Sequence, residues 1–228
     1  MIATEGACAK CGGDQYILTE AGEVSLCECS SEARAARIIR NSGLPKRFLN
    51  AGFRGFDPTT MSMATSLSTV KDWWRRLANH QTTDGLYLYG SVGTGKTHLA
   101  CAAARNLAHD GMEFRFYSVP QLLFELRSTI SRDSESEADI LAPCEEVALL
   151  VLDDFGAEKL TDYARERLYL VFDNRYYRQL PTIVTSNLDA EGLARWDKRI
   201  ASRIEGSCEM VHLVGPDYRQ RKAKEATT

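Results

Sequence analysis

Five short apolar runs, separated by stretches with helical spacing, make up the main part of this chain. The run 147–152 is almost continuously apolar, which is typical of a parallel strand buried on both faces. Segment 113–119 instead alternates apolar and polar residues, which also predicts a strand. The other three predicted strands are 86–89, 181–187 and 208–214. Strands that alternate with helical segments predict an α/β fold with a parallel sheet.

Between these runs, apolar residues recur at intervals of three and four, which predicts helices. Segment 61–80 has this spacing and carries Arg75 and Arg76 toward its end, where positive charge suits the helix dipole. In contrast, the acidic and serine-rich segment 131–139 predicts an exposed loop. The other expected helices are 99–104, 120–130 and 163–180.

Two segments connect the N-terminal region to the first of these elements. Segment 30–41 predicts a short basic helix with Ser30 or Ser31 as its N-cap. It could bind a partner or serve as a solvated connector. Segment 45–58 carries three phenylalanines, which suit either the core of the main domain or the side of a bound adenine.

A glycine-rich motif lies directly between the run 86–89 and the alanine-rich helical stretch that follows. It reads Gly90-Ser91-Val92-Gly93-Thr94-Gly95-Lys96-Thr97. The pattern G-x-x-x-x-G-K-[ST] between a strand and a helix predicts a P-loop, in preference to a glycine turn without a ligand. Glycines let backbone N–H groups close around phosphate oxygens, and the helix N-terminus adds the positive end of its dipole. We expect Lys96 to reach the β- and γ-phosphates, Thr97 to ligate Mg²⁺, and His98 to belong to the same nucleotide-binding segment.

Polar side chains follow two of the predicted strands. Asp153 and Asp154 come directly after one apolar run, and Asn187 ends another. In open α/β sheets, ligands bind at the carboxyl ends of the strands. We expect Asp153 to hold Mg²⁺ opposite Thr97, and Asp154 or alternatively Glu158 to orient or deprotonate the attacking water. Asn187 could hydrogen-bond that water or the γ-phosphate.

Three arginines, Arg195, Arg199 and Arg203, recur at intervals of four and therefore predict one basic helix face. This face could simply be solvated. Alternatively, one of its guanidinium groups could reach the nucleotide of a neighbouring subunit and stabilise charge on the phosphoryl oxygens.

Four cysteines near the N-terminus, Cys8, Cys11, Cys27 and Cys29, have the spacing C-x2-C, fifteen residues, C-x-C. Gly12 and Gly13 supply the positive φ angles that a zinc-knuckle turn uses, and four thiolates satisfy tetrahedral Zn²⁺. Because so short a segment cannot bury enough apolar surface to fold alone, the metal would supply its folding energy. We expect a structural zinc module that serves as a docking surface.

Length and composition limit the remaining possibilities. With 228 residues, 44% of them apolar, the chain can form one α/β domain and a small accessory module. Its 28 basic and 31 acidic residues exclude a global polycation, so any contact with nucleic acid would be local. The chain has no apolar run of about 18 residues and no secretory signal pattern, so we expect a cytoplasmic protein without a membrane partner.

The order of these features resembles that of an AAA+ ATPase. Four segments narrow the resemblance to the bacterial replicative helicase loaders of the DnaC/DnaI type and their transposition relatives of the IstB type. These segments are 86–99, 152–156, 175–177 and 181–187. The resemblance covers residues 45 to 224. The four-cysteine segment is similar to the zinc-bearing helicase-binding domain of some loaders, and it favours a loader.

The resemblance implies a three-layer P-loop AAA+ (ASCE) fold with a five-stranded parallel sheet and no separate helical lid domain. It divides the chain into a zinc-binding, helicase-docking module (1–44) and an ATPase domain with a basic C-terminal tail (45–228). By the family pattern, Asn187 is sensor 1 and Arg219 is sensor 2. Arg203 is the arginine finger, with Arg199 as the second candidate. The implied catalytic residues are Lys96, Asp153, Asp154, Asn187 and Arg203.

The implied function is loading of a hexameric replicative DNA helicase onto single-stranded DNA during replication initiation. The expected activity is Mg²⁺-dependent ATP hydrolysis, weak alone and stimulated by DNA or self-association. The expected cofactors are ATP, Mg²⁺ and Zn²⁺, and the expected partners are the helicase, single-stranded DNA and further copies of the chain in the ATP state. Two alternatives remain open. One is an IstB-like transposition helper ATPase that assembles on duplex DNA and recruits a transposase, and the other is a non-enzymatic adaptor.

Overall fold

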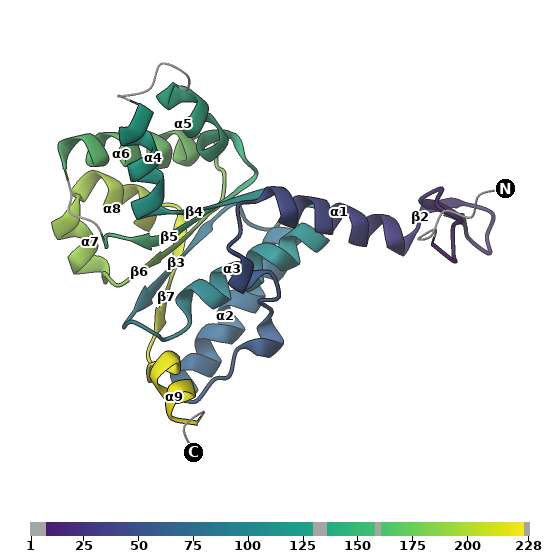
Figure 1. The fold of residues 1–228 in the computed structure, drawn as a ribbon, viewed down its shortest axis with the longest axis horizontal. Helices are drawn as coiled ribbons and strands as arrows, with labels where there is room; N and C mark the ends of the chain where they lie inside the picture. Colours follow the sequence, from purple (N-terminus) through teal and green to yellow (C-terminus); the bar gives the residue numbers. More distant parts are fainter. Residues whose placement is uncertain (1–7, 130–135, 158–160, 226–228) are drawn as a thin grey trace.

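The computed structural model describes residues 8–129, 136–157 and 161–225, with only the backbone described over 222–225. The described chain consists of an α/β body and an N-terminal arm that projects from it (Figure 1). None of the helices in these ranges combines the length and the apolar character needed to cross a bilayer.

A five-stranded parallel sheet forms the centre of the body and confirms the predicted fold class. Its strand order is β4-β5-β6-β3-β7, so the P-loop strand β3 has a neighbour on each side. The strands are β3 (Gly85–Gly90), β4 (Phe114–Ser118), β5 (Leu149–Phe155), β6 (Thr182–Ser186) and β7 (Cys208–Leu213). This order brings the carboxyl ends of β3, β5 and β6 to one edge of the sheet, where a ligand site is expected.

Helices cover both faces of the sheet and give the predicted three layers (Figure 1). On one face, α2 (Met61–Ala78) and α3 (Lys96–His109) pack over side chains such as Leu86 and Val151. On the other face, a second cluster covers Tyr87 and Leu152. Its helices are α4 (Val119–Thr129), α5 (Glu137–Glu146), α6 (Asp162–Tyr177), α7 (Ala190–Trp196) and α8 (Lys198–Glu205). After β7, the described chain forms only the short helix α9 (Tyr218–Glu225).

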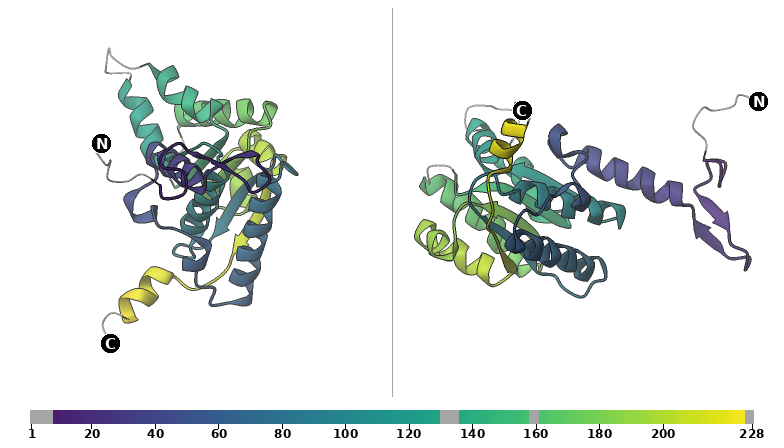
Figure 2. Two further views of the ribbon diagram at one scale, coloured as in Figure 1. Left: turned by 90° about the vertical axis from the view of Figure 1, so that its right-hand side faces the viewer. Right: turned by 90° about the horizontal axis from the view of Figure 1, so that it is seen from below.

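The arm consists of a small hairpin carried on a long helix. Strands β1 (Tyr16–Leu18) and β2 (Val24–Leu26) pair antiparallel, and α1 (Glu28–Asn41) leads from them to the body. The second half of α1 contacts the body through the buried residues Ala35 and Ile38. Arg34 donates a hydrogen bond of 2.8 Å to the carbonyl oxygen of Gly111. The hairpin itself stands clear of the body in Figure 1 and in the right view of Figure 2.

Two short 3₁₀ turns occupy the aromatic segment between the arm and α2. They are η1 (Lys46–Phe48) and η2 (Phe53–Gly55), and they pass beside the N-terminus of α3. The imidazole Nε2 of His98 lies 2.9 Å from the carbonyl oxygen of Gly52. This segment therefore packs against the helix that follows the P-loop.

The N-termini of α1 and α5 differ from the sequence prediction. Helix α1 begins at Glu28 and has Cys27 as its N-cap, so neither Ser30 nor Ser31 caps it. Residues 137–139, predicted as part of a loop, begin α5, where Ser136 and Asp139 form a reciprocal capping box. The serines that indicated a loop also include a strong N-cap, and the burial of Leu141 and Cys144 then stabilises the helix.

The single arginine face predicted over Arg195, Arg199 and Arg203 is wrong. Asp197 interrupts the helix and caps α8 by accepting hydrogen bonds from the backbone of Arg199 and Ile200. Arg195 therefore belongs to α7, whereas the other two arginines belong to α8.

Candidate functional site

The P-loop turns between the end of β3 and the start of α3. Gly95 is the N-cap of α3 and has a φ angle of 94°, a left-handed conformation that L side chains rarely adopt. A Cβ atom at this position would also lie 2.6 Å from the Phe56 ring. Both facts require glycine here and leave the N-terminus of α3 open to an anion.

Lys96 is buried inside this loop. Its Nζ donates hydrogen bonds of 2.8 Å to the carbonyl oxygen of Gly90, 2.7 Å to that of Ser91 and 2.8 Å to Oδ1 of Asn187. Burial lowers the pKa of Lys96. The structure thus joins the P-loop lysine directly to the asparagine at the end of β6, 91 residues away in the chain.

A β-bulge places the two carboxylates of β5 in different environments. Leu152 pairs with Val184 and Phe155 pairs with Ser186, so Asp153 and Asp154 together face the single residue Thr185. Asp154 has a φ angle of 57° and is exposed, whereas Asp153 is buried. Bulges of this kind often redirect a side chain beside an active site.

Thr185 binds both of these residues. Its hydroxyl donates a 2.6 Å hydrogen bond to Oδ1 of Asp153 and accepts a 3.1 Å hydrogen bond from the backbone N–H of Asp154. Burial raises the pKa of Asp153, while hydrogen bonds from Thr185 and Thr97 act in the opposite direction. The Asp153 carboxylate therefore lies beside the Thr97 hydroxyl, and together they form an oxygen pair suited to Mg²⁺.

A cavity of about 560 Å³ opens in front of these groups. Its lining residues include Val92, Gly93, Gly95, Lys96, Thr97, His98, Asp154, Asn187 and Arg219, all of which were predicted site residues. Gly90, Ser91, Thr94 and Asp153 are not among the lining residues; the carbonyl oxygens of Gly90 and Ser91 hold Lys96, and the Thr94 hydroxyl donates to that of Ser91. Glu158, the alternative to Asp154, lies outside the described residues.

Further lining residues come from the two chain segments that flank the P-loop. Arg47 and Phe48 of η1 approach from one direction, and Tyr218 approaches from the start of α9. The Tyr218 backbone N–H donates a 3.0 Å hydrogen bond to the carbonyl oxygen of Gly93, which fixes α9 on the P-loop. The phenylalanines of segment 45–58 indicated that a residue such as Phe48 could lie beside a bound adenine. No local sequence signal indicated that Arg47 or Tyr218 would line the site.

The finger candidates lie away from this cavity, on α8. The Nε of Arg203 donates a 2.7 Å hydrogen bond to Oδ1 of Asp173, and its guanidinium lies 4.8 Å from the centre of the Tyr176 ring. Arg199 instead lies over the ring of Tyr169 at 4.6 Å. Neither residue lines the site of its own subunit.

The four N-terminal cysteines lie together in the arm, with sulfur atoms within 4.8 Å of one another. The sulfurs of Cys8 and Cys27 are 3.7 Å apart, and those of Cys11 and Cys29 are 3.4 Å apart. Tetrahedral Zn²⁺ with Zn–S bonds of about 2.3 Å needs sulfur separations of about 3.8 Å, so this set fits the metal.

The local backbone favours the thiolate at two of the four cysteines, whereas a hydrogen bond with Cys11 raises the pKa of Cys29 and burial raises that of Cys27. Backbone N–H groups of Lys10 and Cys11 lower the pKa of Cys8 to about 6, and the N–H of Gly13 lowers that of Cys11. Disulfides do not compete for these residues, because every cysteine in the structure is free. The cluster could therefore hold a metal ion at the start of α1.

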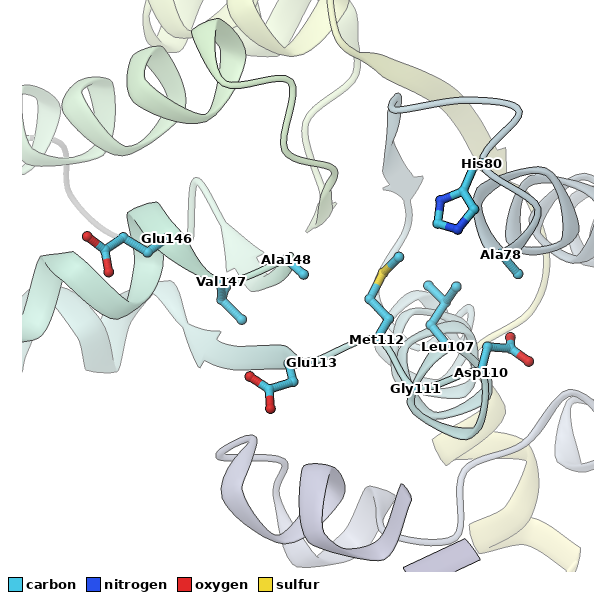
Figure 3. Close-up of a pocket in the computed structure, with 10 residues that line it drawn as sticks. All are labelled: Ala78, His80, Leu107, Asp110, Gly111, Met112, Glu113, Glu146, Val147 and Ala148. Atoms are coloured by element: carbon cyan, nitrogen blue, oxygen red, sulfur yellow. The ribbon is translucent and has the colours of Figure 1, made fainter. Parts of the chain in front are cut away.

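A second cavity, of about 540 Å³, lies at the opposite end of the sheet. Figure 3 shows Glu113 and Glu146 on one side of it and His80 and Asp110 on the other. It lies before the strands begin, not at their carboxyl ends, and contains no predicted site residue. Parallel α/β sheets bind ligands at the other edge.

The site and the sheet define a P-loop ATPase fold of the AAA+ type. A protein-family model described as "IstB-like ATP binding protein" matches residues 33–226. The chain belongs to this family of ATP-binding proteins.

The relatives of this chain are named for different functions. Over 157 residues the chain is 29% identical to the replicative helicase loader DnaI of Bacillus subtilis, covering 68% of this chain and 50% of that protein. The chain thus spans only half the length of that relative. It is also 29% identical, over 63% of its length and 60% of the relative, to y4pL of Sinorhizobium fredii, named as an insertion sequence ATP-binding protein.

The crystal structure of a DnaC helicase loader gives a TM-score of 0.67 at 28% identity. The match covers 75% of this chain and all of the DnaC chain.

Proposed function

We propose that this protein is an ATP-dependent loader that places a hexameric replicative helicase onto single-stranded DNA during replication initiation. One observation carries the proposal: a P-loop nucleotide site on the body is combined with a four-cysteine module on a projecting arm. The similarity to DnaI and to the DnaC structure supports it. The body (45–228) is the ATPase, and the arm (1–44) docks the helicase.

The chain's own residues divide the work of hydrolysis. Lys96 and the P-loop N–H groups hold the phosphates, while Thr97 and Asp153 hold Mg²⁺. Asp154, redirected by the bulge, orients or deprotonates the attacking water, and Asn187 links that position to Lys96. Bound ATP supplies the γ-phosphoryl group, and Mg²⁺ neutralises charge on its oxygens.

Arg203 is a better candidate for the arginine finger than Arg199. Asp173 holds its Nε, and two tyrosine rings lie under the guanidinium, at 4.8 and 5.7 Å. No described residue hydrogen-bonds its two terminal nitrogens, so their N–H groups are available for the phosphate of a neighbouring subunit. Arg199 is more exposed and lacks a hydrogen-bonded carboxylate of this kind. The site is therefore completed by self-association in the ATP state.

An IstB-like transposition helper is the second candidate, because the matching family model and the S. fredii relative are associated with insertion sequences. Such a protein would assemble on duplex DNA. The loader instead requires single strands, and a non-enzymatic adaptor would not turn over ATP.

Filter binding and ATP turnover with matched single-stranded and duplex DNA separate these functions. A loader binds single strands preferentially in the presence of ATP and hydrolyses ATP faster when they are added. Preference for duplex DNA would favour the transposition helper. Absence of turnover with either DNA would favour the adaptor.

A further inference from the structure

Four large apolar side chains lie exposed on the hairpin of the arm. Tyr16 is 57% exposed, Leu18 74%, Val24 71% and Leu26 63%. The register pairs Tyr16 with Leu26 and Leu18 with Val24, so all four project from the same side of β1 and β2. We call this set the hairpin face. An exposed apolar group of this kind at the tip of an arm is typical of an interaction site.

The chain itself leaves this face uncovered. Helix α1 carries the hairpin away from the body, and Figure 1 and the right view of Figure 2 show no other described element beside it. The cysteine cluster does not need these side chains either, because they alternate with Ile17 and Ser25, which are less exposed. The hairpin face therefore has no structural role within the described chain.

Charges around the hairpin narrow the choice of partner. Asp14, Glu20 and Glu23 are exposed on or next to it, and the one nearby lysine, Lys10, is paired with Glu28. This acidic border repels the phosphates of nucleic acids and of anionic lipids. It also disfavours a second copy of the hairpin, because two acidic borders would then meet.

We propose that the hairpin face docks onto an apolar patch, bordered by basic side chains, that is repeated on every subunit of the helicase ring. This inference rests on the proposed loader function and specifies the surface that carries it. Four side chains are few compared with the 20–30 residues per side of a standard interface, so one hairpin binds weakly. Several hairpins in one ATP-dependent assembly bind a ring together, and linked weak contacts commonly gain about 10²–10⁴ in apparent affinity.

The test uses the full chain and the replicative helicase encoded in the same genome, immobilised for affinity measurements with and without a slowly hydrolysed ATP analogue. The double variant Leu18→Thr/Val24→Thr removes apolar surface and places threonine, a β-branched residue suited to a strand, at both positions. The matched control, Met61→Thr/Val214→Thr, removes two exposed apolar side chains from the body. Zinc content, measured by mass spectrometry, reports whether the zinc module of each variant is folded.

We expect the hairpin variant to retain zinc and, in the presence of the ATP analogue, to bind the helicase at least about tenfold more weakly than the wild type does. The affinity of the control variant should stay within about twofold of the wild-type value. Wild-type binding should also be weaker without the analogue. A zinc-loaded hairpin variant that binds as wild type does would overturn the docking face but leave the loader function standing. Failure of the wild type to bind the helicase would instead contradict the loader function. Sedimentation showing that the wild type self-associates through the hairpin would assign the face to a second copy.

Discussion

Thr185 organises the sheet edge that carries the proposed catalytic carboxylates, although it does not line the cavity. It lies buried in β6 and holds the Asp153 carboxylate and the Asp154 backbone at the bulge. Its hydrogen bond opposes the effect of burial on Asp153 and so favours the carboxylate form that Mg²⁺ needs. Thr185 is a positioning residue.

Replacing Thr185 by valine should therefore raise the pKa of Asp153 further. More of the protein then carries a protonated Asp153 at a given pH, so the acid limb of the ATPase pH profile should move to higher pH. We also expect a stability loss of about 1–3 kcal/mol from the unpaired polar groups. Comparison with Thr69→Val, at a partly exposed threonine of α2, tests this, and an unchanged acid limb would contradict the assigned role.

At the scale of elements, Arg175 joins three parts of the body. Its side chain is 1% exposed and donates to Thr182 Oγ1 and to the carbonyl oxygens of Cys144, Val147 and Pro181 at 2.7–3.0 Å. Burial lowers the pKa of Arg175 to about 10, so the guanidinium remains charged at neutral pH. It connects α6 to the end of α5 and the start of β6.

We expect Arg175→Met to destabilise the body by about 3 kcal/mol or more, because it leaves several buried carbonyl groups without donors. The exposed neighbour Arg178→Met should change stability by less than about 0.5 kcal/mol. Urea unfolding of both variants measures the difference. Equal midpoints for the two variants would show that Arg175 does not hold these elements together.

Much of the fold was predictable from the sequence because its signals are local. The five strands follow from apolar runs, and the P-loop follows from a contiguous motif between a strand and a helix. The parallel order then places Asp153 and Asn187 at the same edge. The bulge was not predictable, since it depends on pairing between β5 and β6.

The other missed features also depend on tertiary structure. The hydrogen bond between Tyr218 and Gly93 joins residues 125 positions apart, so no sequence window contains both. Asp197 fits the helical spacing of its neighbours, yet its side chain caps the next helix and separates Arg195 from Arg203. A periodic pattern does not reveal such a break when the capping residue stands at a position where the helix would also carry a polar residue.

At the scale of the whole molecule, we expect that the arm can lose its function while the body keeps its own. Changing Cys8 and Cys11 to serine removes two of the four proposed zinc ligands, so the module should lose its metal and its fold. We expect helicase binding to be lost while ATP binding by the body is retained. Cys208→Ser, outside the cluster, is the control for zinc content, and loss of ATP binding in the double variant would contradict separate roles.

Assembly should matter for hydrolysis more than for nucleotide binding. Arg203→Ala should leave ATP affinity nearly intact but reduce hydrolysis stimulated by DNA or self-association by about 10³-fold or more. Arg199→Ala should have a much smaller effect, because its guanidinium is less fixed. A normal stimulated rate in Arg203→Ala would show that this residue is not the finger.

Loading on closed circular single-stranded DNA tests the central claim most directly, because a circle has no ends and a helicase ring must be opened to enclose it. The measurement is ATP-dependent unwinding of an oligonucleotide annealed to the circle by the helicase from the same genome. We predict efficient unwinding only with this protein and ATP, and none with Lys96→Ala. Equal unwinding without the protein, or with Lys96→Ala, would contradict the account.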